Sequence, residues 1–170
     1  MIKCVTKSIT TCLILSVLNS AILYSCNSSG NTPLDDRELR GVFSVKGTNG
    51  MQEGTSSREY FKATDELSVS CKEVKSGDFV QVTFKNEQSA HMANKFRLVK
   101  AFKSITDSKK KDEVDFAYYS DGKFYYSDEN STGEIRTTND GSKYIITFEN
   151  VSAINIPDKE VKYISGRIEY

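Results

Sequence analysis

The stretch that decides the fold class runs Ala117-Tyr118-Tyr119-Ser120-Asp121-Gly122-Lys123-Phe124-Tyr125-Tyr126. Asp121-Gly122 supplies two residues that tolerate positive φ, as a two-residue hairpin turn requires. Aromatic residues on both sides of the turn favour strands. The turn therefore predicts an antiparallel hairpin with a defined register, in which the opposed pairs are Ser120 with Lys123, Tyr119 with Phe124, Tyr118 with Tyr125, and Ala117 with Tyr126.

The same signals recur outward from this hairpin along the rest of the chain. Short alternating apolar runs are separated by turn residues, as in Ser76-Gly77-Asp78 and Asn139-Asp140-Gly141. The predicted strands cover residues 41–46, 58–63, 66–74, 79–85, 113–119, 123–127, 133–138, 143–149 and 162–170. This pattern predicts an all-β domain, an antiparallel sandwich or barrel of about nine strands.

Residues 88–105 fit two interpretations. Met92, Phe96 and Val99 have the spacing of a helical stripe, which predicts one short helix. Phe96 and Leu98 also fit the alternation of a strand. Both readings stay open at the level of sequence.

Aromatic residues occupy both faces of the predicted hairpin. Tyr119, Phe124 and Tyr126 share one face with Ala117, and Tyr118 and Tyr125 share the other. One core cannot bury both faces unless both are covered. Exposed aromatic residues give contact area at a low cost in side-chain entropy, so the candidate ligand contacts are Tyr118, Tyr119, Phe124, Tyr125 and Tyr126. The alternative is that these rings only stabilise neighbouring strands.

The N-terminal residues have the organisation of an export signal. Lys3 and Lys7 precede an apolar run over residues 9–23, which is shorter than the roughly 20 residues that span a bilayer. The run ends in Leu23-Tyr24-Ser25-Cys26, which resembles the lipobox of bacterial lipoproteins. The resemblance implies cleavage before Cys26, diacylglycerol on its sulfur and an acylated N-terminus, an anchor that several acyl chains make permanent. We expect a signal peptide over 1–25, a lipidated cysteine and flexible tether over 26–36, and a single β-domain over 37–170.

Composition argues against several classes of function. Without Lys3 and Lys7 the chain has 21 basic and 23 acidic residues, a net charge of −2 with no basic stripe, so no nucleic acid is expected as a partner. Cys71 is the only cysteine of the predicted domain and is in phase with Leu67 and Val69, as a buried residue would be. His91 is the only histidine and has no recognisable nucleophile motif nearby. We expect no enzyme, no metal site and no cofactor.

Three further resemblances concern the predicted domain. The segments 133–135, 144–148 and 163–168 resemble small β-domain lipoproteins of the Bacteroidota. The start, Glu38-Leu39-Arg40-Gly41-Val42-Phe43, resembles lipocalin-like barrels, which implies an apolar cup for a small hydrophobic ligand. The stretches Val80-Gln81-Val82-Thr83-Phe84 and Ala117-Tyr118-Tyr119-Ser120-Asp121-Gly122 resemble the lysozyme-inhibitor lipoproteins, which implies a periplasmic inhibitor.

These observations lead to one functional expectation with alternatives. We expect a lipid-anchored, non-enzymatic binding module of the bacterial cell envelope, at the outer membrane or cell surface. Its partners would be the membrane, through the N-terminal lipid, and a protein, a glycan or a small apolar ligand. The alternatives are a lipocalin-like carrier of a small hydrophobic ligand and a periplasmic inhibitor of a lysozyme-type enzyme.

Overall fold

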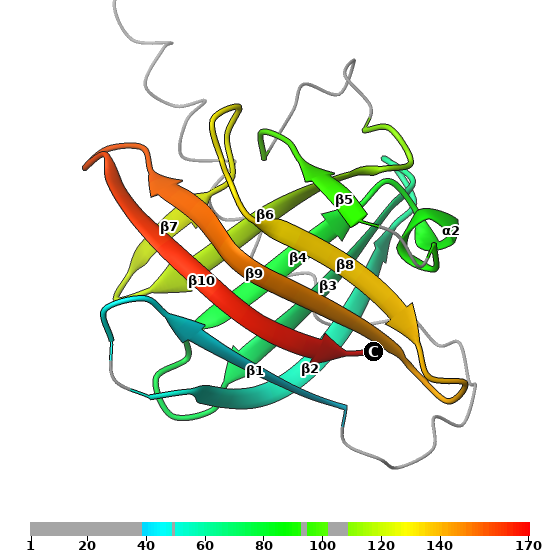
Figure 1. Cartoon of the computed structure of the whole chain (residues 1–170), viewed down its shortest axis with the longest axis horizontal. Coiled ribbons are helices and arrows are strands. Elements are labelled where there is room, and N and C mark those ends of the chain that lie inside the picture. The colour runs from blue at the N-terminus through cyan, green and yellow to red at the C-terminus, as the bar shows by residue number, and fades with distance from the viewer. Residues whose placement is uncertain (1–38, 49, 93–94, 102–108) are drawn as a thin grey trace, which may run out of the picture. The chain divides into compact units, whose positions relative to one another are not determined.

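The computed structural model describes residues 39–48, 50–92, 95–101 and 109–170, which belong to the compact unit Arg37–Tyr170. These residues form one ten-stranded sheet and one short helix (Figure 1). The strands are β1 (Arg40–Val45), β2 (Gln52–Phe61), β3 (Glu66–Glu73), β4 (Phe79–Phe84), β5 (Lys95–Leu98), β6 (Glu113–Ser120), β7 (Lys123–Tyr126), β8 (Glu134–Asn139), β9 (Tyr144–Asn155) and β10 (Glu160–Glu169). The predicted all-β class is confirmed.

The strand pairings form a closed cycle, because β10 pairs both with β1 and with β9. The order of neighbours is β10-β1-β2-β3-β4-β6-β5-β8-β9-β7, and further pairings join β10 to β9 and β6 to β7. All pairings are antiparallel except that of β5 with β6. β1, the first strand described, pairs over five residues with β10, the last. This pairing connects strands from opposite ends of the described chain, so neither strand is left with a free edge along these residues.

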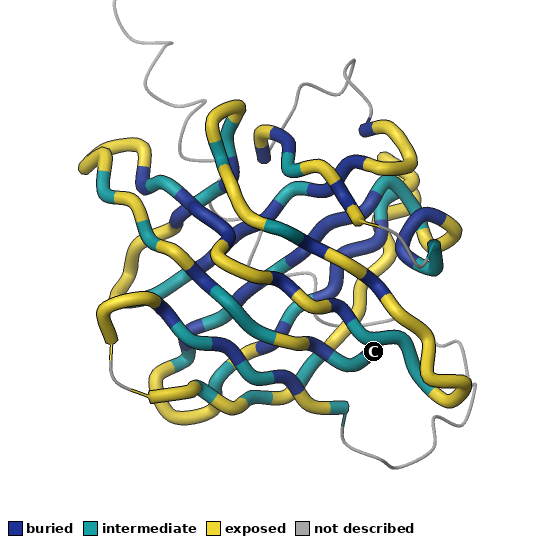
Figure 2. Tube along the Cα trace, viewed as in Figure 1, coloured by how far each residue is buried: buried dark blue, intermediate teal, exposed yellow. Residues whose placement is uncertain are grey.

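The core is formed by the inward-facing residues of nearly every strand. Buried residues recur at every second position along β1 (41, 43 and 45), in β8 (135 and 137) and at the start of β9 (146 and 148) (Figure 2), as expected of strands with one face packed on a core. Phe43, Phe84, Phe116 and Phe148 are at most 2% exposed. Phe116 and Phe148 lie 5.5 Å apart between ring centroids, so side chains from β6 and β9 meet across the interior.

The segment 88–105 contains parts of both predicted structures. Helix α2 covers only Glu87–Ala90 and begins after Asn86, whose side-chain oxygen accepts a hydrogen bond from the Ser89 backbone N–H at 2.9 Å. The predicted helical stripe is wrong beyond this turn, because Phe96 lies in β5. The strand alternative is confirmed for Lys95–Leu98. Residues 93–94 and 102–108 lie outside the described residues.

Two strands are longer than the sequence predicts. β2 begins at Gln52 rather than near residue 58, through a polar stretch that pairs with both β1 and β3. β9 continues past residue 149 to Asn155. Its pairing with β10 shifts register between Ile164 and Gly166, a bulge that lets the strand bend and keep its neighbours. In both cases long-range pairing overrides a weak local signal.

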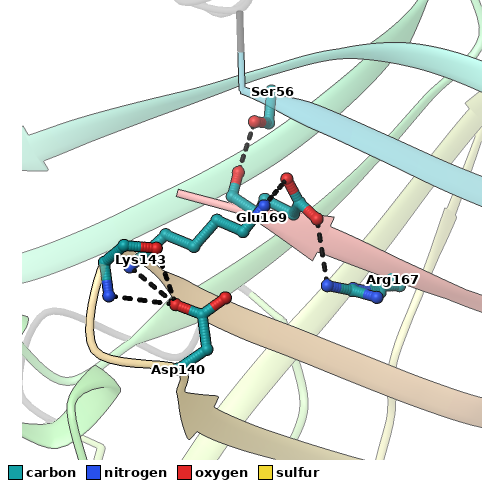
Figure 3. A network of polar contacts seen from close by, with 6 residues as sticks. Ser56, Asp140, Lys143, Arg167 and Glu169 are labelled. Atoms are coloured by element: carbon teal, nitrogen blue, oxygen red, sulfur yellow. Dashed lines mark hydrogen bonds and ion pairs between the residues drawn. The ribbon is translucent and has the colours of Figure 1, made fainter. Parts of the chain in front are cut away.

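A polar network holds together the end of the domain at which the described chain terminates (Figure 3). Glu169 accepts hydrogen bonds from Lys143 at 2.5 Å and Arg167 at 3.0 Å, and its backbone carbonyl accepts one from the Ser56 hydroxyl. The Asp140 carboxylate accepts hydrogen bonds from the backbone N–H groups of Ser142 and Lys143, both at 3.0 Å. The hydrogen bonds from Ser142 are the largest cause of the lowered Asp140 pKa. The network joins β2, the β8–β9 turn and β10.

No helix in the described parts of the chain combines the length and the apolar character needed to cross a membrane.

Candidate functional site: an exposed aromatic face

The β6–β7 hairpin has the predicted register. The structure pairs Tyr119 with Phe124, Tyr118 with Tyr125, Ala117 with Tyr126 and Ser120 with Lys123. Both turn residues have positive φ, 51° at Asp121 and 77° at Gly122, which is the geometry that a twisted two-residue hairpin needs. Because side chains alternate along each strand, this register separates the aromatic residues into two sets on opposite faces.

The first set belongs to the core. Tyr118 and Tyr125 are each 3% exposed, and the Tyr118 ring meets the Phe43 ring edge to face at 6.1 Å. The Tyr125 hydroxyl donates a hydrogen bond to Glu160 at 2.7 Å, and burial is the main reason why the pKa of Tyr125 is raised. These two candidate contacts therefore do not reach the solvent-exposed surface of the hairpin.

The second set forms a continuous surface, which we call the aromatic face: Phe79 on β4, Tyr119 on β6, and Phe124 and Tyr126 on β7. Phe79 pairs with Tyr119, and Tyr119 pairs with Phe124, so three rings lie in one row across three strands. The ring centroids are 5.3 Å apart for Phe79 and Tyr119, and 4.8 Å apart for Tyr119 and Phe124. Phe124 is 42% exposed, and the other three rings are partly exposed.

Phe79 is the residue of this face that the sequence analysis did not single out. Along Phe79-Val80-Gln81-Val82-Thr83-Phe84 the residues Val80, Val82 and Phe84 are fully buried. Phe79 is thus an aromatic residue in the otherwise polar phase of the strand, together with Gln81 and Thr83. An aromatic residue among the polar positions of a predicted strand could have marked Phe79 as exposed. The sequence could not show that Phe79 lies beside Tyr119, because that contact depends on the pairing of β4 with β6.

Aliphatic residues extend the aromatic face along the end of β9. Ile154 pairs with Tyr126, and Ile156 follows in the turn after β9. Ile156 is 65% exposed. The Asn155 side chain donates a hydrogen bond to the Phe124 carbonyl at 2.8 Å, which fixes β7 against β9. The rings are therefore supported by strands on both sides.

The charged groups beside the hairpin turn are paired with one another. Lys123 Nζ lies 2.6 Å from Asp158 and 3.9 Å from Glu160, and Lys162 Nζ lies 2.6 Å from Glu160. The hydrogen bond to Asp158 is the largest cause of the raised Lys123 pKa. These pairs are exposed and contribute little to stability. Their effect on the site is to leave the border of the aromatic face without an excess of either charge.

A second surface feature is an open hollow of about 600 Å³ over β8, β9 and β10, lined by both polar and apolar groups. Its arginine and one of its glutamates neutralise each other, because Glu134 accepts from Arg136 and from Lys95. The hollow is lined by Glu134, Arg136, Thr147, Phe148, Glu149, Ser165 and Gly166.

Cys71 and His91, the two other residues considered in the sequence analysis, both pack against neighbouring side chains of the domain. Cys71 is fully buried with Leu67 and Val69, as predicted, and burial raises the pKa of its thiol to about 11. His91 caps α2 and stacks on Tyr144 at 3.8 Å, with its Nε2 4.0 Å from Glu87. Among the described residues no three histidine, cysteine or acidic side chains gather as metal ligands would. Cys26 lies outside the described residues.

Comparison with known proteins adds no relative. No family model matches the chain, and no match was found among the curated proteins or the solved structures.

Proposed function

We propose that this protein is a lipid-anchored, non-enzymatic binding module of the bacterial cell envelope that contacts its ligand through the aromatic face. The observation that carries the proposal is the row of Phe79, Tyr119 and Phe124, which are in ring contact with one another and remain partly exposed. Aromatic side chains dominate the energetics of binding surfaces. Rings held on paired strands lose little further freedom when a ligand binds.

The packing of the interior favours this outer surface over an internal ligand site. A lipocalin-like carrier needs an apolar cup inside the sheet. Here Phe84 meets Phe96 at 5.2 Å, and Phe116 meets Phe148 at 5.5 Å, so large side chains occupy the interior between these strands. The aromatic face offers apolar surface without displacing any of them.

The anchoring part of the proposal rests on the leader. Lys3, Lys7, the apolar run over 9–23 and Leu23-Tyr24-Ser25-Cys26 together resemble a lipoprotein signal. Lipid on Cys26 would hold the domain at the membrane, with residues 27–36 as a tether. Localisation at the outer membrane or cell surface belongs to the same proposal.

The anchoring is tested by replacing Cys26 with Ala and fractionating cells. We expect the wild-type protein to incorporate a labelled fatty acid and to sediment with membranes. We expect the Cys26→Ala variant to lose the label. Protease treatment of intact cells then reports whether the domain faces outward. A Cys26→Ala protein that still carries the lipid label would contradict the proposal.

The binding surface is tested by photo-crosslinking in cells. A benzophenone side chain replaces Phe124 on the aromatic face, and in a matched control it replaces Phe61 on β2. The two phenylalanines are 42% and 40% exposed, so they differ in place rather than in accessibility. We expect a discrete adduct from position 124 only. Equal adducts from both positions, or none from position 124, would count against the aromatic face as the binding surface.

A further inference from the structure

The aromatic face carries no charged side chain in its two rows. One row is Phe79, Tyr119 and Phe124, and the next is Gln81, Ala117, Tyr126 and Ile154, each residue opposite its neighbour in the sheet register. Lys72 of β3 lies opposite Phe79, at the end of the first row. Beside the hairpin turn, Lys123 and Lys162 pair with Asp158 and Glu160. Because the border carries charges of both signs, the surface has no strong electrostatic preference for an anionic or a cationic ligand.

The size of the aromatic face sets a second limit. An aromatic side chain has about 150–250 Å² to bury, and Phe124 is 42% exposed while the other three rings are less so. Together the four rings present no more than about 375 Å². A standard protein interface buries roughly 800 Å² on each side. The rings alone would therefore form less than half of such an interface, and they suit a narrow ligand.

The rings also have a regular arrangement. Phe124 and Tyr126 are two residues apart on β7, and their planes differ by only 2° at a centroid distance of 5.7 Å. Such rings offer apolar surfaces with a repeat set by the strand. Tyr119 adds a hydroxyl group to the same surface, and Gln81 adds a side-chain amide in the next row, so the face combines apolar area with hydrogen-bonding groups.

We infer that the ligand of the aromatic face is an uncharged carbohydrate chain. A sugar ring has a face rich in C–H groups that packs on an aromatic ring, while its hydroxyl groups remain available for hydrogen bonds. A polysaccharide is narrow, repeats along its length and needs no ionic partner, which matches the area, the ring arrangement and the balanced charge described above. This inference rests on the proposed function, in which the aromatic face is the binding surface.

The inference is tested with the full-length protein in detergent, by affinity electrophoresis through gels containing one soluble neutral polysaccharide each. The probes are hydroxyethyl cellulose, galactomannan, soluble starch and dextran, and alginate serves as an anionic comparison. We expect at least one neutral probe to retard the protein. Phe124→Ala should weaken that retardation at least tenfold, and the matched Phe61→Ala should change it less than twofold. Raising the salt concentration should have little effect, because no ion pair is involved.

Two results would overturn the inference and differ in what they leave standing. If no neutral probe retards the protein but position 124 still gives a discrete crosslinked adduct in cells, the face binds something other than carbohydrate and the proposed function survives. If no neutral probe retards the protein and position 124 gives no adduct, the inference and the proposed function both fail. Retardation by alginate alone would also contradict an uncharged ligand.

Discussion

Lys109 is buried between two carboxylates, Glu66 on β3 and Asp115 on β6. Its side chain is 6% exposed, and its Nζ lies 2.8 Å from Asp115 and in contact with Glu66. Removing one partner from a buried ion pair leaves an uncompensated charge and costs about 3–5 kcal/mol. We therefore expect Lys109→Met to lower the free energy of unfolding by roughly that amount in urea denaturation. A loss below about 1 kcal/mol would show that water solvates these carboxylates freely.

The same cluster gives a pH dependence with a definite sign. Burial raises the pKa of Asp115, and the charge of Lys109 opposes that rise. Without Lys109 the folded-state pKa should rise further above the unfolded value. An acid of this kind destabilises the fold above its folded pKa. That cost begins to fall as the pH drops below the folded pKa and is gone below the unfolded pKa. The stability deficit of Lys109→Met should therefore shrink as the pH is lowered toward 3.8, the ordinary pKa of an aspartate, and Lys109→Met/Asp115→Asn should remove most of that pH dependence.

The β6–β7 hairpin is the element that the sequence predicts best. Its turn chemistry is local, since Asp121 and Gly122 alone determine where the strands reverse and which residues face each other. Local sequence could not predict which of its aromatic rings lie in the core and which lie on the surface. Tyr118 and Tyr125 are buried because β1 contributes Phe43 to the same side, and Tyr119 is exposed beside Phe79 because β4 lies next to β6.

A substitution at Gly122 measures the effect of backbone conformation on stability without a change in side-chain packing. Its φ is 77°, and an added Cβ would meet no atom within 4 Å, so a substitution is penalised by backbone conformation alone. We expect Gly122→Ala to cost about 1–2 kcal/mol and Gly122→Asn to cost less, because asparagine tolerates this region. Urea denaturation measures both values. Equal losses for the two variants would point to a contact that the turn makes elsewhere.

The sequence predicted where most strands lie but not how they pair. The class and most strands followed from alternation and turns, whereas β1 with β10 and β4 with β6 are contacts between distant segments. No local pattern encodes such pairings, since many registers bury the same apolar residues. The sequence left β5 open between helix and strand for the same reason. Its strand conformation depends on two-residue pairings with β6 and with β8, which are distant in the chain.

The uneven support of the strands predicts an uneven local stability. β9 and β10 pair with each other over nearly their whole length and contribute Phe148, Ile164 and Ile168 to the core. The last part of β2, residues 57–61, is exposed throughout and pairs only with β3 among the described strands. Backbone hydrogen bonds with few buried neighbours open at a low free-energy cost.

Hydrogen exchange measured by mass spectrometry should follow that order. We expect amides of β9 and β10 to exchange last, near the free energy of global unfolding, and those of residues 57–61 and of β5 to exchange well before them. Gly166→Ala should reduce the protection of β1, β9 and β10 together, because its Cβ would lie 2.3 Å from the Val42 carbonyl and 2.6 Å from the Phe148 ring. If that variant loosened only β10, the closure of the sheet through β1 would be a local contact rather than part of the cooperative unit.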